Sequence, residues 1–154
     1  MNVFLVRAGL TAGDPSAPEL HLSREGRQVV RQVASTLMRL EAPSFDRVMV
    51  SPTVAAAQTA ELFADRVDFL GVVEALGALT SGVPPAVSAA AVLASGANVA
   101  VVADEPALSA LGAFLVGRPT FPPLLHGQVS VIEDRAPAYC LRPGDQVRSL
   151  LLVA

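Results

Sequence analysis

Three short segments place small, polar or charged residues directly after apolar runs, and they hold the side chains best suited to chemistry. They are Arg7-Ala8-Gly9, Ser51-Pro52 and Asp104-Glu105-Pro106. A guanidinium binds anions, a serine hydroxyl caps helices, and a carboxylate pairs with a cation or caps a helix. These side chains can form a common site only if the three segments lie close together in the fold.

The other reactive side chains are isolated in the sequence. His21 and His126 are the only histidines, and Cys140 is the only cysteine. A lone histidine is more often a structural or surface residue than a nucleophile, so we expect neither histidine to react. Cys140 stands in an apolar run, which is typical of an inert buried thiol. The sequence contains no cluster of metal ligands, and we expect no metal and no cofactor.

The apolar runs before the three segments have the composition of strands buried on both faces. Helical patterns alternate with them, which predicts a three-layer α/β/α sandwich with a mostly parallel central sheet. Ligands bind such sheets at the carboxyl ends of the strands, so the three segments should lie at one edge. The predicted strands are Val3–Val6, Asp46–Val50, Asn98–Ala103 and, later, 127–134, 138–142 and 147–153.

Four helices are predicted from apolar spacing and capping residues. In the first, Val29, Val33, Leu37 and Leu40 recur at helical spacing, and Ser23 is the expected N-cap. In the second, the Ser51 hydroxyl is the expected cap, because a proline favoured at the first helical position follows it. The helices are expected at 22–41, 52–66, about 83–93 and 107–117.

Length and composition limit the classes of protein. The 154 residues fit a single domain over 1–154, and 52% hydrophobic with 16% charged residues excludes disorder. A net charge of −3 without a basic cluster argues against nucleic-acid binding. Glycines and prolines divide the uncharged stretch 75–103, so we expect no membrane contact. One cysteine and no secretion signal predict a cytoplasmic protein, and the surplus apolar content favours a homo-oligomeric face.

Four motifs follow one another in a recognisable order. They are Arg7-Ala8-Gly9, Leu22-Ser23-Arg24-Glu25-Gly26, Ser51–Ala60 and Asp104-Glu105-Pro106. This order resembles the histidine phosphatase (phosphoglycerate mutase-like) superfamily, and most closely its small bacterial phosphohistidine phosphatase branch. That family has Arg-His-Gly, Leu-Thr-x-x-Gly, Ser-Pro-x-x-Arg-Ala-x-Gln-Thr-Ala and His-x-Pro. The resemblance covers nearly the whole chain and implies a phosphoglycerate mutase-like fold.

The departures from the family pattern fall on its reactive residues. The resemblance places Ala8 where the family has its nucleophilic histidine, Ala55 where an arginine binds phosphate, and Asp104 where the second histidine contacts the phosphoryl group. The residues that mark the remnant of the phosphate pocket are Arg7, Ala8, Gly9, Ser51, Ala55, Asp104 and Glu105.

These substitutions remove both the nucleophile and the positive charge. A methyl group has no lone pair to attack phosphorus, so Ala8 cannot form a covalent intermediate. The charges of Arg7 and Asp104 sum to zero, and a carboxylate ~4 Å from a phosphate repels it by ~4 kcal/mol at an effective dielectric constant near 20. We therefore expect a catalytically degenerate domain with no catalytic residue.

Several alternatives stay open at this point. Asp104 could pair with Arg7 and close the old pocket, or it could cap the helix that follows, with Glu105 as a first-turn acid. The leading interpretation is a non-catalytic binding or regulatory protein, whose partner by family analogy would be a phosphorylated signalling protein. The others are a phosphatase of altered mechanism and a structural, oligomer-forming subunit.

Overall fold

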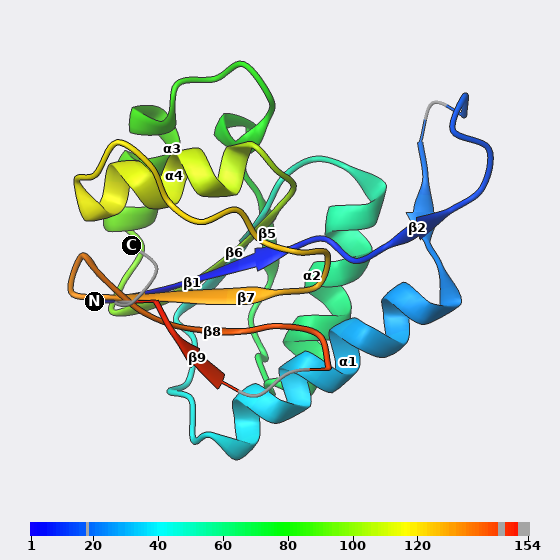
Figure 1. The fold of residues 1–154 in the computed structure, drawn as a ribbon, viewed down its shortest axis with the longest axis horizontal. Helices are drawn as coiled ribbons and strands as arrows, with labels where there is room; N and C mark the ends of the chain where they lie inside the picture. The colour runs from blue at the N-terminus through cyan, green and yellow to red at the C-terminus, as the bar shows by residue number, and fades with distance from the viewer. Residues whose placement is uncertain (18, 145–146, 151–154) are drawn as a thin grey trace.

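A seven-stranded sheet forms the centre of the protein in a computed structural model that describes residues 1–17, 19–144 and 147–150. Its strand order is β5-β4-β6-β1-β7-β8-β9 (Figure 1). The first four of these are parallel, and β7, β8 and β9 extend the sheet in antiparallel fashion. The strands are β1 (Asn2–Arg7), β4 (Arg47–Val50), β5 (Val73–Ala75), β6 (Asn98–Ala103), β7 (Val129–Glu133), β8 (Ala136–Leu141) and β9 (Val147–Ser149).

Two layers of helices cover the sheet, one on each face. The side chains of β1 alternate between them: Phe4 and Val6 pack in the core beneath α1 and α2, whereas Val3 and Leu5 pack with α3 and α4. This confirms the predicted three-layer α/β class. The helices are α1 (Arg24–Arg39), α2 (Val54–Arg66), α3 (Pro85–Leu93) and α4 (Ala107–Val116), with a 3-10 turn η1 at Gly77–Leu79.

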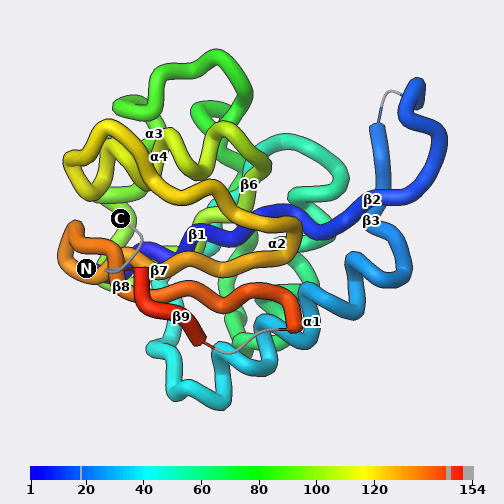
Figure 2. Tube along the Cα trace, in the orientation of Figure 1, coloured from blue at the N-terminus to red at the C-terminus, as the bar shows by residue number. Residues whose placement is uncertain are grey.

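A small hairpin at one end of the molecule was not predicted. Its strands β2 (Thr11–Ala12) and β3 (His21–Leu22) pair antiparallel between β1 and α1. Figure 2 shows it projecting from the body of the fold on the side where β1 ends. The short strand β5 also lies in a stretch without a strong sequence signal.

The capping prediction is confirmed for the first helix and wrong for the second. Ser23 Oγ accepts a hydrogen bond from the Gly26 N–H at 2.9 Å, as expected of an N-cap. The second helix begins later than predicted, with Thr53 as its N-cap, while Ser51 is buried and its N–H donates to Val102 O. The proline at 52 did not start the helix, because the chain first bends at 52–53, where the Thr53 N–H donates to Ser51 O at 2.8 Å.

The first helix buries a slightly different stripe from the predicted one. Val33 and Leu37 are buried, but Val29 is only partly covered and Leu40 is exposed at the helix end. Val30 and Ala34 complete the buried stripe instead. At the chain end, β9 covers 147–149 of the strand expected at 147–153, and 151–153 lie outside the described residues.

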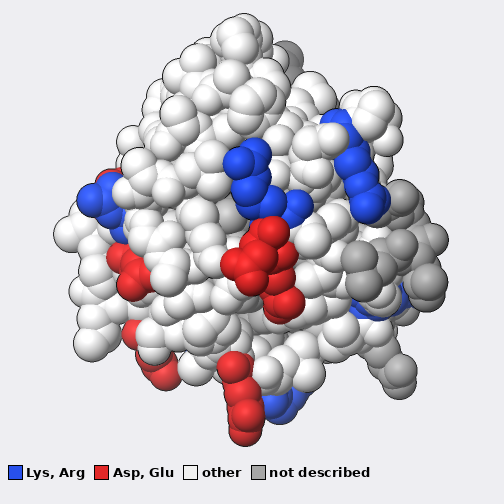
Figure 3. Space-filling model, turned by 90° about the vertical axis from the view of Figure 1, so that its left-hand side faces the viewer, with Lys and Arg blue, Asp and Glu red and all other residues white. Residues whose placement is uncertain are grey.

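The uncharged stretch of the sequence folds as several short elements. It forms η1, α3 and β6 after the last residue of β5, and no helix in the described ranges is both long and apolar enough to cross a membrane. Neither α3 nor α4 contains a charged residue. In Figure 3 the top of the face, where α3 and the segment before it lie, shows no charged side chain.

Candidate functional site

The three segments singled out in the sequence meet at one edge of the sheet. Strands β4, β6 and β1 are neighbours and parallel, so their carboxyl ends lie side by side. The N–H of Ala8 donates to Ala103 O at 2.9 Å, and the N–H of Ser51 donates to Val102 O at 2.9 Å. The turns after the three strands are therefore hydrogen-bonded to one another, as expected for a ligand site in an α/β sheet.

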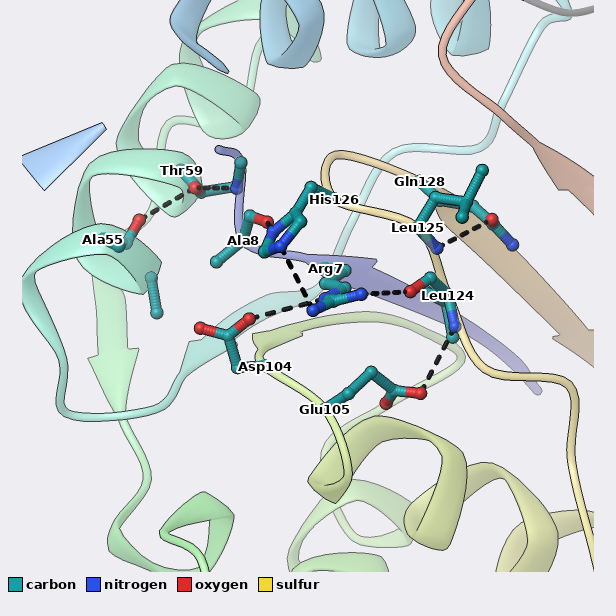
Figure 4. A network of polar contacts seen from close by, with 12 residues as sticks. Arg7, Ala8, Ala55, Thr59, Asp104, Glu105, Leu124, Leu125, His126 and Gln128 are labelled. Atoms are coloured by element: carbon teal, nitrogen blue, oxygen red, sulfur yellow. Dashed lines mark hydrogen bonds and ion pairs between the residues drawn. The ribbon is translucent and has the colours of Figure 1, made fainter. Parts of the chain in front are cut away.

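The guanidinium of Arg7 is engaged on three sides (Figure 4). Its Nη1 donates to Leu124 O at 2.6 Å, its Nη2 lies 3.2 Å from His126 Nε2, and its Nε lies 3.5 Å from Asp104 Oδ1. The contact with Asp104 is the longest of the three. Arg7 is thus tied to the loop before β7 more firmly than to the carboxylate.

The hydrogen bonds of His126 assign the tautomer of its ring. Its Nδ1 lies 3.1 Å from Ala8 O, and because a carbonyl oxygen only accepts, Nδ1 must carry the proton. In the neutral ring Nε2 then accepts from Arg7 Nη2. Both ring nitrogens therefore have partners. The other histidine, His21, lies on the hairpin, where its Nδ1 is 3.1 Å from Gln58 Nε2.

Asp104 does not cap the fourth helix, so the capping alternative is wrong. The residue at the N-cap is Pro106, without a side-chain cap, and the helix N-terminus is served by Glu105 instead. One oxygen of Glu105 accepts from the Ser109 N–H at 2.8 Å, and the other accepts from the Leu124 N–H at 3.2 Å. Glu105 thereby fixes the loop whose carbonyl group holds Arg7.

A cleft of about 390 Å³ opens beside the Arg7 cluster. The pairing of Arg7 with Asp104 therefore occurs as expected, but it does not close the pocket. Among the described residues, the charged side chains that line the cleft are Glu19 and Asp104, both acidic. The cleft is lined by Gly9, Thr11, Ala17, Glu19, Leu20, Pro52, Thr53, Val54, Ala55, Asp104 and His126.

A second hollow of about 250 Å³ adjoins the cleft on the other side of Asp104. Both hollows share Pro52, Thr53 and Asp104, and the second extends to Leu79 and Pro106. Asp104 is half exposed, with 49% of its side chain accessible. The side chain of Asp104 therefore separates the two hollows and is accessible to solvent.

The remaining motif residues hold the loop after β1 in place. The Gly9 N–H donates to Thr59 Oγ1 at 3.1 Å, and that hydroxyl donates to Ala55 O at 2.8 Å. A side chain on Gly26 would collide with the carbonyl oxygen of Leu10, so only glycine lets α1 approach this loop. These contacts give Gly9, Gly26 and Thr59 a structural role that needs no ligand.

Sequence reasoning missed the contribution of the loop before β7. Leu124 and His126 lie more than a hundred residues from Arg7 in the chain, and no local pattern around them indicates a site. The only available signal was that His126 directly precedes a predicted strand. Ala8 is almost fully buried, and Ala55 lines the cleft through its methyl group.

No protein-family model matches this chain, and no curated protein matches it. Solved structures do. The protein histidine phosphatase SixA, complexed with tungstate, superposes with a TM-score of 0.75 at 23% identity and 100% coverage of both chains. A protein named SixA from Agrobacterium tumefaciens gives a TM-score of 0.73 at 15% identity, covering 92% of this chain and 98% of that one.

A further match is a phosphoserine phosphatase from Entamoeba histolytica in complex with phosphoserine, in a mutant with a histidine replaced by alanine. Its TM-score is 0.64 at 15% identity, covering 84% of this chain and 89% of that one. At these identities the matches establish the fold. The chain has the fold of the histidine phosphatase superfamily, and the two SixA structures match 100% and 92% of its length.

Proposed function

We propose that this chain is a catalytically degenerate phosphohistidine-phosphatase-like protein that acts by binding or regulation rather than by phosphoryl transfer. The observation that carries the proposal is Ala8. It occupies the position that the family pattern gives to the nucleophile, and the residue is 1% exposed. No lone pair is present there to attack phosphorus.

The electrostatics of the cleft support the same proposal. Arg7 donates to Leu124 and His126, and the charged groups lining the cleft in the described part of the chain are the carboxylates Glu19 and Asp104. A dianionic phosphoryl group would meet like charge where a phosphatase presents arginine. The two carboxylates raise the free energy of the transition state of phosphoryl transfer as well as that of the bound substrate.

Binding without catalysis is compatible with this fold. The phosphoserine phosphatase mutant that matches this chain lacks one histidine and was captured with phosphoserine. By analogy, the partner would be a phosphorylated signalling protein in the cytoplasm, with recognition outside the acidic cleft. That partner class, like the cytoplasmic location, belongs to the proposal.

The second candidate is a phosphatase of altered mechanism, and one observation favours it. His126 lies in the wall of the cleft next to Arg7, where a relocated nucleophile would need to be. For Nε2 to attack, it would first have to lose its hydrogen bond from Arg7. The third candidate, a structural subunit, would use the uncharged surface of α3 and α4 and predicts a stable dimer in a size measurement.

Hydrolysis of a phosphohistidine peptide and of a generic phosphomonoester tests the proposal. The wild-type chain should release no phosphate, and His126→Ala and His21→Ala should behave alike. Phosphate release that disappears in Arg7→Ala and His126→Ala but persists in the matched control His21→Ala would overturn the proposal in favour of altered chemistry. Release that survives Arg7→Ala would indicate a contaminating enzyme. A circular dichroism melt checks that each variant is folded.

A further inference from the structure

A hollow of about 360 Å³ lies between α1 and the end of β8, and it shares no residue with the cleft. Figures 1 and 2 show α1 passing beside the end of β8, where this hollow is formed. We call it the α1–β8 groove. Its lining in the described part of the chain is Gln32, Val33, Thr36, Arg39, Leu141, Arg142, Gly144 and Val147.

The Nε of Arg142 has no hydrogen-bond partner within the described residues. This nitrogen is buried and makes no hydrogen bond. A guanidinium has donors and no acceptor, so only an acceptor group can satisfy this nitrogen. Buried donors without acceptors are rare in folded proteins, and each one calls for an explanation such as a bound ion.

The opposite wall of the groove presents a second, pre-oriented arginine. Arg39 Nη2 donates to Thr36 Oγ1 at 2.9 Å, and that hydroxyl donates to Gln32 O at 3.0 Å. A simpler role is available to Arg39, because a cation at the end of a helix interacts favourably with the helix dipole. That role does not explain Arg142, which directly follows β8 and belongs to no helix.

The charge around the groove is opposite in sign to that of the whole chain. The protein carries −3, yet α1 contains four arginines and one glutamate. The charged residues lining the groove, as far as the chain is described, are Arg39 and Arg142. Val33, Leu141 and Val147 supply apolar surface between them.

We propose that the α1–β8 groove binds a small organic oxyanion, a carboxylate or phosphate group carried on a short apolar body. The planar guanidinium of Arg142 suits the two oxygens of such a head group. Arg39 supplies the second positive charge, and the three aliphatic side chains contact the apolar body. The proposal concerns a site separate from the acidic cleft and does not rest on the proposed function.

Titration of the full chain with hexanoate, hexyl phosphate and inorganic phosphate, followed by calorimetry, tests this. We expect saturable binding of both alkyl anions, with inorganic phosphate weaker because it lacks the apolar body. Arg142→Met keeps the aliphatic stem but removes the charge, and it should weaken binding about tenfold or more. Arg118→Met, an exposed arginine outside the groove, should leave binding unchanged.

Two further variants make the test decisive. Arg142→Lys keeps the charge without the planar fork and should bind with intermediate affinity. Asp145→Asn removes the carboxylate that lies closest to Arg142 in the sequence. The proposal fails if the wild-type chain shows no saturable binding, if Arg142→Met binds as well as wild type, or if binding requires Asp145→Asn. In that last case the natural occupant of the groove would be the carboxylate of Asp145 and not a separate anion.

Discussion

Replacing Asp104 by asparagine tests how the negative charge in the cleft affects anion binding without changing the shape of the cleft. The two side chains have nearly the same size, and only the negative charge is lost. The ion pair with Arg7 contributes little, because its N–O distance is 3.5 Å and the side chains are 21% and 49% exposed. Pairs as exposed as this are worth about 1 kcal/mol or less, so the variant should fold normally.

The expected gain in oxyanion affinity follows from Coulomb's law. A carboxylate about 4 Å from a phosphate or tungstate anion repels it by about 1 kcal/mol in bulk water and about 4 kcal/mol at an effective dielectric constant near 20. Asp104 is half exposed, so the lower part of this range applies. A gain of about 1–2 kcal/mol corresponds to a roughly five- to thirtyfold tighter binding.

Calorimetric titration with tungstate at low and high salt measures this gain. The gain in Asp104→Asn should shrink as salt screens the charges. The matched control is Asp65→Asn, which removes the same charge from the far end of α2, eleven residues from Val54 and therefore about 16 Å along the axis. The electrostatic reasoning is refuted if Asp104→Asn binds tungstate no tighter than wild type, or if Asp65→Asn gives the same gain.

Three predictions concern stability. Gly26→Ala should lower the free energy of unfolding by about 1–3 kcal/mol or more in denaturant titrations, because its methyl group meets a backbone carbonyl, whereas Gly77→Ala has open space and should be nearly neutral. Thr59→Val leaves the buried N–H of Gly9 without an acceptor and should cost about 1–3 kcal/mol, while Thr59→Ser should not. Burial, and to a smaller extent the nearby Glu133, raise the pKa of Tyr139 in the folded protein. The stability that Tyr139 contributes is therefore fully present below about pH 10 and is lost as the pH rises through the raised pKa. Tyr139→Phe should remove this part of the loss of stability at alkaline pH, measured by denaturant titration.

Much of the fold could be predicted because its signals are local. Continuous apolar runs marked β1, β4 and β6, and the positions of their carboxyl ends follow from parallel pairing. The second helix start was misplaced because Ser51-Pro52 carries a capping pattern, although the chain bends at 52–53 and the helix begins only after Thr53. Local patterns show which residues can cap a helix, but tertiary contacts decide which one does.

The sequence predicted only part of the candidate site, because tertiary contacts decide which loops take part in it. The segment after β1 and the segment after β6 were expected to meet, and the contact between Arg7 and Asp104 shows that they do. The loop before β7 was not expected to take part, since its Leu124 contributes a main-chain carbonyl group. A carbonyl oxygen belongs to every residue, and no sequence pattern announces which one will accept a bond.

The contacts of Arg7 give this arginine a structural role that needs no phosphate. Its guanidinium satisfies the Leu124 carbonyl and fixes the ring of His126, which in turn donates to the carbonyl of Ala8. Loss of Arg7 would therefore leave part-buried polar groups of two loops without partners. Folding alone is then sufficient to retain this arginine, and its presence is not an argument for phosphate binding. Ala8 and Ala55 differ from Arg7 in this respect, because the hydrogen bonds at these two positions run through their main-chain oxygens and not through their side chains. The hydrogen bonds at this edge of the sheet therefore depend on the side chain of Arg7 and not on the side chains of Ala8 and Ala55.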